Sequence, residues 1–111
     1  MPRRQRADPL AAAIGQRIKQ LREERGLTIE KLAYESELGS KGYLSDIERG
    51  LARPTVTTLK AISDHLGLLL LDIVTFPEQD ERQKLTDRLR KVTPGGLRRL
   101  VREVGAGGRP K

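Results

Sequence analysis

Apolar side chains recur at every third or fourth position through most of this chain, which is the spacing of one face of an α-helix. The first row predicts a helix over residues 10–25, which Gly26 ends. The side chains expected to face inward on this helix are Leu10, Ile14, Ile18 and Leu21. Thr28 can cap a second short helix, and Glu30 in the first turn suits the positive end of the helix dipole. The inward side chains of that helix and of the turn after it are Ile29, Leu32, Ala33 and Leu38.

A tight turn at residues 37–39 separates the second helix from a third. Gly39 can adopt a positive φ in this turn at no steric cost. Ser40 can cap the third helix, which is expected to run to Arg49 with Leu44 and Ile47 facing inward. The side chains left largely outward are Lys41, Gly42, Ser45, Asp46 and Arg49. Two short helices around a tight turn are the arrangement that places a row of side chains in a DNA major groove.

A fourth helix is expected from the N-cap Thr55 to the stop at Gly67. Its inward side chains are Val56, Leu59, Ile62 and Leu66. Residues 68–75 are apolar enough to form a short, buried fifth helix. The pattern therefore predicts an all-α domain of five helices over residues 10–76.

Residues 77–104 are expected to form a helical appendage after the boundary at Phe76–Pro77. Two apolar rows predict a helical hairpin there, which we expect to mediate dimerisation: Leu85, Leu89 and Val92, then Leu97, Leu100, Val101 and Val104. Residues 1–9 are Arg-rich and punctuated by proline, which predicts a flexible basic arm. Residues 105–111 are glycine-rich, which predicts a disordered tail.

The composition favours packed helices and gives little support to an enzyme. Aromatic residues make up only 3% of the chain, so the core must be built from Leu, Ile, Val and Ala. The chain has no cysteine and a single histidine, His65, so we expect no metal site and no cofactor. No nucleophile lies beside an activating histidine. The apolar runs are too short to span a membrane, and we expect a cytoplasmic, nucleoid-associated protein.

The net charge of +7 indicates an acidic partner such as nucleic acid, but the charge is unevenly distributed. Residues 9–76 hold nine basic and nine acidic side chains, so the predicted five-helix domain is neutral. The excess lies in residues 1–8, with a net charge of +2, and in residues 77–111, with +5. The basic flanks can bind phosphate or simply keep the protein in solution.

Several short motifs in one register resemble the Cro and lambda-repressor-like, or XRE-type, helix-turn-helix regulators. The matching residues are Leu32-Ala33, Tyr43-Leu44-Ser45, Ile47-Glu48-Arg49-Gly50, Pro54, Thr58-Leu59 and Leu66-Gly67. The resemblance covers about residues 14–74. It implies a five-helix lambda-repressor-like domain that binds double-stranded operator DNA, usually as a homodimer on a pseudo-palindromic sequence. The third helix is then the recognition helix.

Carried over position by position, the resemblance implies base contacts near the start of the recognition helix. Lys41, Gly42 and Ser45 match positions that contact base edges in this family, with Tyr43 and Asp46 beside them. Lys41 can donate hydrogen bonds to guanine O6 and N7. Gly42 has no side chain and would allow close approach. A solvated lysine at a helix start is the alternative interpretation of Lys41.

Phosphate contacts are expected from helix N-termini and from nearby hydroxyl or basic groups. The candidates are Arg17, Thr28, Arg49, Arg53 and Thr57. Arg53 is the strongest of them, because the loop after the recognition helix follows the DNA backbone in such domains. An exposed loop arginine without a partner is the alternative interpretation.

Arg22 and Glu48 match a family pair that joins the first helix to the recognition helix, so the resemblance implies a structural ion pair. Two positions depart from the family pattern. Ile29 stands where a polar residue, often Gln, supports contacts from the second helix. The turn at residues 37–39 also looks one residue longer than usual, which would change the angle of the recognition helix.

Three functions follow as hypotheses. The first is a sequence-specific transcriptional regulator that binds DNA as a homodimer. The second is a protein-interaction adaptor, an antitoxin-like protein or accessory subunit, that uses residues 77–104 and binds DNA weakly or non-specifically. The neutral charge of residues 9–76 and the missing glutamine support the second. The third is an architectural protein whose basic flanks bind phosphate non-specifically.

Overall fold

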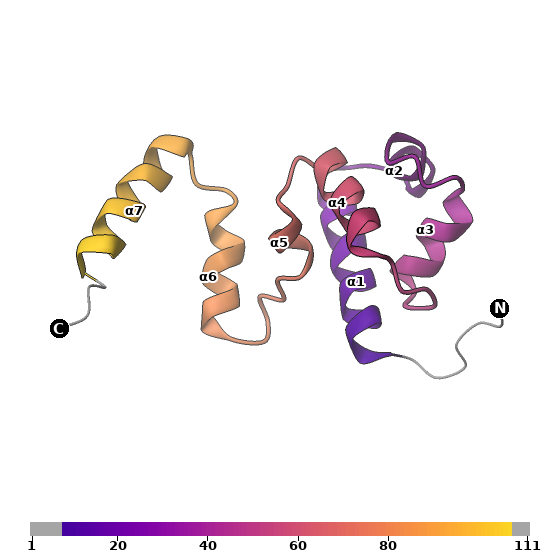
Figure 1. The fold of residues 1–111 in the computed structure, drawn as a ribbon, viewed down its shortest axis with the longest axis horizontal. Coiled ribbons are helices and arrows are strands. Elements are labelled where there is room, and N and C mark those ends of the chain that lie inside the picture. Colours follow the sequence, from indigo (N-terminus) through magenta and orange to yellow (C-terminus); the bar gives the residue numbers. More distant parts are fainter. Residues whose placement is uncertain (1–7, 108–111) are drawn as a thin grey trace. The chain divides into compact units, whose positions relative to one another are not determined.

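The computed structural model describes residues 8–107, and all regular structure in that range is helical (Figure 1). The helices are α1 (Pro9–Glu24), α2 (Ile29–Glu35), α3 (Lys41–Glu48), α4 (Val56–His65), α5 (Leu70–Ile73), α6 (Glu81–Leu89) and α7 (Pro94–Gly107). The chain divides between Phe76 and Pro77 into an N-terminal unit with α1–α5 and a C-terminal unit with α6 and α7. Residues 1–7 and 108–111, most of the predicted arm and tail, lie outside the described residues.

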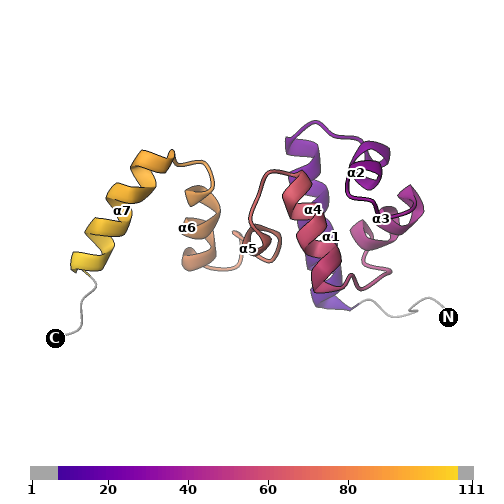
Figure 2. The ribbon, with the colours of Figure 1, turned by 45° about the horizontal axis from the view of Figure 1, so that its top comes forward.

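The five helices of the N-terminal unit surround one aliphatic core (Figures 1 and 2). In this unit α1 packs against α3 and α5, α2 packs against α3 and α4, and α4 packs against α5. The largest fully buried apolar side chains are Ile18, Leu21, Leu32, Leu44, Ile47, Ile62, Leu66 and Ile73. All but Ile73 come from a predicted apolar row, and Ile73 lies in the apolar segment 68–75, so helical periodicity accounts for most of the core.

Helices α1 to α4 each begin with a side chain that caps the free backbone N–H groups of the first turn. Thr28, Ser40 and Thr55 accept hydrogen bonds from the N–H groups of Lys31, Tyr43 and Thr58 at 3.1, 3.2 and 3.1 Å, respectively. Asp8 caps α1 in the same way, so this helix begins before the predicted residue 10. Such a cap stabilises a helix by about 1 kcal/mol.

The same four helices also end alike: the residue that follows the C-cap has a positive φ. Gly26, Gly50 and Gly67 occupy this position after α1, α3 and α4, with φ of 72°, 77° and 71°. After α2 the position is held by Glu37, with φ of 56°, and the next residue's N–H bonds to Ala33 O at 3.1 Å. A side chain at positive φ is unfavourable, so the turn before α3 stores strain.

Gly15 determines how closely α1 and α3 approach each other. A Cβ atom at this residue would lie 2.1 Å from the carbonyl oxygen of Ile47 and 2.8 Å from that of Glu48. Only glycine leaves room for this contact, which fixes the position of α3 on the domain.

Three expectations for the helices of this unit are wrong. Leu10 and Val56 were expected to face inward, but 60% and 69% of their surfaces are exposed. Both lie in the first turn of a helix, at the rim of the domain, and Ala11 takes the buried place on α1 instead. The fifth helix covers only Leu70–Ile73 of the predicted residues 68–75.

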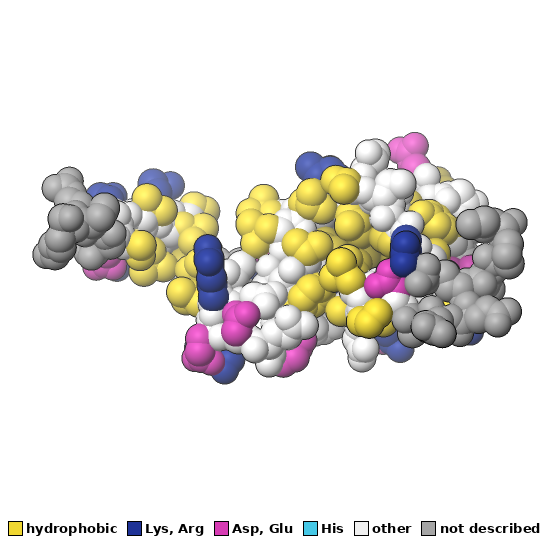
Figure 3. All heavy atoms as spheres, turned by 60° about the horizontal axis from the view of Figure 1, so that its bottom comes forward, with side chains coloured by type: hydrophobic (Ala, Val, Ile, Leu, Met, Phe, Trp, Pro, Cys, Tyr) yellow, Lys and Arg dark blue, Asp and Glu magenta, His cyan; other side chains and the backbone are white. Residues whose placement is uncertain are grey.

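In the C-terminal unit, α6 and α7 are joined by residues 90–93. Asp80 caps α6, and α7 continues to Gly107, past the predicted end at residue 104. Their apolar rows are only partly covered. Leu89, Val92 and Leu100 are half-buried, whereas Leu85, Leu97, Val101 and Val104 are exposed. Figure 3 shows hydrophobic side chains at the surface of both units, among dispersed Lys and Arg side chains. Within residues 8–107, no helix is long and apolar enough to cross a membrane.

Candidate nucleic-acid interface

The candidate interface is the outward face of α3. On the opposite side of this helix, Leu44 and Ile47 are buried in the core. Lys41, Gly42 and Arg49 are exposed on the outward face, and Ser45 is half-buried. These four positions are spaced so that they share one side of the helix. The structure therefore brings together a lysine, an open backbone position, a hydroxyl and an arginine along one short helix.

Tyr43 and Asp46 lie at the edge of this face. Both are half-buried, and the Tyr43 ring packs against the core cluster. The ring therefore contributes to packing. Asp46 places a carboxylate beside Ser45, where it can accept a hydrogen bond but repels a phosphate.

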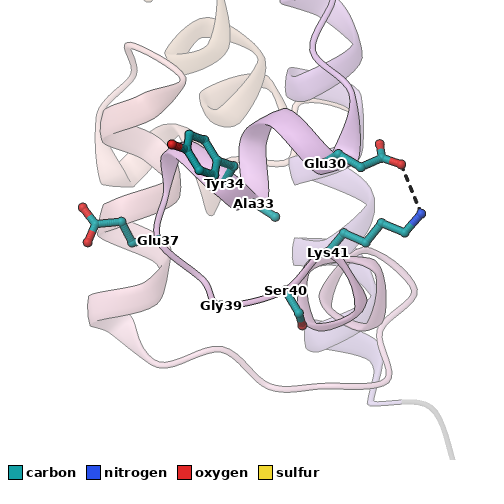
Figure 4. A pocket seen from close by; sticks show the side chains of 7 residues that line it. All are labelled: Glu30, Ala33, Tyr34, Glu37, Gly39, Ser40 and Lys41. Carbon is teal, nitrogen blue, oxygen red and sulfur yellow. Dashed lines mark hydrogen bonds and ion pairs between the residues drawn. The ribbon is translucent and has the colours of Figure 1, made fainter.

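Lys41 is joined to Glu30 across the helix-turn-helix (Figure 4). Its Nζ lies 3.1 Å from Oε2 of Glu30, and both side chains are 63% exposed. The backbone N–H of Glu30 and the Lys41 ammonium hold the pKa of this carboxyl below its usual value. The two residues lie at one end of a hollow of about 540 Å³ between α2 and α3. Its lining also includes Ala33, Tyr34, Glu37, Gly39 and Ser40.

The five candidate phosphate contacts occupy different environments. Arg49, Thr57 and Thr28 are exposed, and the Thr28 hydroxyl oxygen caps α2. Arg53 is also exposed in the loop between α3 and α4, where its guanidinium lies 2.7 Å from Oδ2 of Asp8. Arg53 is thus accessible but is joined to a carboxylate.

Arg17 does not belong to this group, so that expectation is wrong. It is only 3% exposed, and its Nε donates a hydrogen bond to the Asp72 carbonyl oxygen at 2.8 Å. The side chain therefore joins α1 to α5 inside the domain and cannot reach a phosphate. Its spacing from Ile14 and Leu21, three and four residues away, already places it on the inward face of α1.

Arg22 and Glu48 form a bidentate ion pair between α1 and α3. Arg22 Nε lies 2.7 Å from Glu48 Oε2, and its Nη2 lies 3.1 Å from Oε1. Both residues are buried, and a third hydrogen bond joins Arg22 to the Leu27 carbonyl oxygen at 2.7 Å. The hydrogen bonds that Arg22 donates to Glu48, and the negative charge of that carboxylate, raise the pKa of Arg22 despite burial. The pair fixes α3 relative to α1 and to the start of α2.

Two acidic residues of this surface were missed by sequence reasoning. Asp8 was assigned to the flexible arm, although an Asp before a proline and an apolar row is a helix-start signal. Glu30 was expected only to interact favourably with the positive end of the α2 dipole. It is 11 positions from Lys41, and no local rule pairs residues at that separation across a turn. Among residues 8–107, no three His, Asp or Glu side chains are grouped so that they could hold a metal ion.

Comparison with known proteins finds matches over the same part of the chain. A helix-turn-helix family model matches residues 18–73. The immunity repressor protein of Bacillus phage phi105 is 46% identical over 61 residues, which are 55% of this chain and 42% of that protein. The chain thus spans less than half the length of this relative. The transcriptional regulator DdrOP3 of Deinococcus deserti is 31% identical over 92 residues, 83% of this chain and 67% of that protein.

The fold is similar to that of a solved regulator complex. A chain of the SinR–SinI protein complex superposes with a TM-score of 0.61 at 28% identity. The superposition covers 86% of this chain and 97% of that one.

Proposed function

The chain belongs to the helix-turn-helix family, and we propose that it regulates transcription by binding operator DNA through the outward face of α3. The observation that supports this most is the exposed row on α3, which the Arg22–Glu48 pair and the Gly15 contact hold in a fixed place. A rigid helix with a polar outward row fits the width of the major groove.

In this proposal the start of α3 contacts base edges. The Lys41 ammonium donates to guanine O6 or N7, and the Ser45 hydroxyl contacts a base or a neighbouring phosphate. Gly42 lets the backbone approach the groove closely, since it has no side chain. The position is open, because a Cβ there would meet nothing nearer than Ser40 Oγ at 3.7 Å. Tyr43 and Asp46 flank these contacts. An Asp46 carboxylate can accept a hydrogen bond from the cytosine amino group.

Phosphates are contacted by the residues around α3. Arg49 at the end of α3 and Arg53 in the next loop provide the cationic contacts. Thr28 and Thr57 provide hydroxyl groups at the starts of α2 and α4. Because Arg53 is joined to Asp8, its contact with a phosphate must compete with that carboxylate.

The protein acts as a homodimer in this proposal, with half-sites about 10 base pairs apart. The exposed apolar side chains of α6 and α7 provide surface for a second copy, and separately so do Leu69, Leu71 and Val74 around α5. The SinR–SinI complex shows that a protein of similar fold assembles with a protein partner, so residues 77–104 could also bind a different protein. In this proposal the protein is cytoplasmic and associated with the nucleoid, because a transcription regulator acts at the chromosome.

Selection of bound sequences from random duplexes tests the function. The full chain should enrich a pseudo-palindromic sequence and bind it at least a thousandfold more tightly than random duplex, at about 0.15 M salt. Lys41→Ala should relax the preference at one base position in each half-site, whereas Arg53→Ala should weaken all sequences alike. Equal affinity for all duplexes would contradict the proposal. Sedimentation of the free and DNA-bound protein tests the dimer, and a monomer in both states would contradict it.

A further inference from the structure

The ion pair between Lys41 and Glu30 joins the base-contacting helix to the helix before it. Lys41 is the first residue of α3, and Glu30 lies in the first turn of α2 (Figure 4). Both groups are largely exposed, and such a pair in water adds little to the stability of a fold. The main consequence of the pair is therefore its effect on which hydrogen-bond acceptors Lys41 binds.

A carboxylate beside a lysine changes the preference of that lysine between two kinds of acceptor. A phosphate is an anion, so Glu30 repels it and competes with it for the ammonium group. Guanine O6 and N7 are uncharged acceptors and are not repelled in this way. Lysine has three N–H donors, so it can keep its bond to Glu30 and still donate to a base.

We propose that Glu30 is a specificity-determining residue, which weakens the attraction of Lys41 for DNA phosphates more than its hydrogen bonding to an operator base. The proposal rests on the proposed function, since it assumes that α3 faces the groove. Glu30 is a positioning residue here, because it acts through Lys41 and not by touching DNA.

Two acidic residues line the hollow beside Lys41, and of these Glu30 is the one that meets it. Glu37 lines the same hollow, but its carboxylate points away from Lys41 (Figure 4). If the charge of Glu30 is removed, the Glu37 carboxylate therefore does not take its place beside the Lys41 ammonium. Because residues 9–76 are neutral, release of one lysine is a large relative change in the attraction of this domain for phosphate.

Glu30→Gln in the full chain tests the proposal, with Asp64→Asn as the matched control. Asp64 forms an exposed ion pair with Lys60 on α4, at 2.6 Å, so both variants remove one surface carboxylate from one lysine. The probes are the selected operator duplex and a random duplex, each titrated over a series of salt concentrations. Unfolding midpoints of both variants confirm that they are folded.

Glu30→Gln should strengthen binding to the random duplex several-fold more than binding to the operator. The plot of log affinity against log salt for the random duplex should steepen by about 0.9, the value for one more neutralised phosphate. Asp64→Asn should change neither the ratio of affinities nor this slope. Adding Lys41→Ala to Glu30→Gln should return the slope to that of Lys41→Ala alone.

Two results would overturn the inference. One is a Glu30→Gln variant whose slope and affinity ratio match those of Asp64→Asn. The other is a loss of operator affinity in Glu30→Gln, since Glu30 would then contact DNA directly. A wild-type protein that binds all duplexes equally contradicts the proposed function instead. In that case the slope on random duplex still decides whether Glu30 restrains Lys41.

Discussion

Replacing Gly15 with alanine should destabilise the N-terminal unit, because α1 and α3 touch at this residue. The added Cβ would lie 2.1 Å from the carbonyl oxygen of Ile47, whereas an ordinary contact begins at 3.4 Å. The obstacle is backbone, which cannot rotate away as a side chain can. Helix α3 would therefore have to shift by about 1.3 Å, the difference between these two distances.

The expected loss follows from two opposing effects. Alanine is favoured over glycine within a helix by about 1 kcal/mol. Overpacking costs about 1–3 kcal/mol, and a contact with two carbonyl oxygens belongs at the upper end of that range. The free energy of unfolding should fall by about 2 kcal/mol, as measured by urea denaturation followed by circular dichroism. Operator affinity should also fall, because the shift displaces the outward row of α3.

Gly42→Ala is the matched control, since Gly42 is also a helical glycine of the same unit. Its added Cβ would lie 3.7 Å from the Ser40 hydroxyl oxygen, an ordinary contact. This variant should gain about 0.5–1 kcal/mol from helix propensity. A Gly15→Ala variant that unfolds at the wild-type urea concentration or above it would show that α1 and α3 do not approach as closely as described.

Three further predictions concern single side chains. Arg22→Met should lower the free energy of unfolding by about 3–5 kcal/mol in the same urea assay, because it strands the buried Glu48 carboxylate. The double variant with Glu48→Leu should recover much of that loss, and a single variant as stable as wild type would contradict the reasoning. Glu37→Gly should raise stability by about 1 kcal/mol, since it relieves a positive φ, and an unchanged urea midpoint would show that the turn is not strained. The backbone N–H and side chain of Gln83 hold the pKa of Asp80 below its usual value. The stabilisation of α6 by Asp80 is therefore complete above about pH 4 and is lost as the pH falls through the lower pKa of the folded state. Hydrogen-exchange protection of α6 amides should decrease there in the wild type but not in Asp80→Asn, which keeps the cap.

The boundaries of α2, α3 and α4 were predictable because each depends on residues that are neighbours in sequence. The caps Thr28, Ser40 and Thr55 bond to an N–H three residues later, so a short window of sequence contains both partners. The buried rows follow from the same local geometry. The exception is Glu37, since nothing in its identity indicates that it takes the position that glycine takes after α1, α3 and α4.

The partners of the charged surface residues were not predictable, because they come from distant parts of the chain. Arg53 meets Asp8 only when the loop after α3 folds back to the start of α1. Lys41 meets Glu30 only when the turn at residues 37–39 brings α3 beside α2. A helical period shows which side chains face outward, but it does not show which opposite charge another element places beside them.

These ion pairs reduce the positive charge with which the N-terminal unit could attract DNA. Of the basic residues in the N-terminal unit, Arg17 and Arg22 are used inside the fold, and Lys41 and Arg53 are joined to carboxylates. A domain of this kind attracts phosphate weakly, so non-specific binding is weak as well. In the proposed complex with DNA, discrimination would then come from the fit of α3 in the groove and from two copies binding at once. The net charge of +5 in residues 77–111 adds attraction that does not depend on sequence. Affinity and specificity would thus reside mainly in different parts of the same chain.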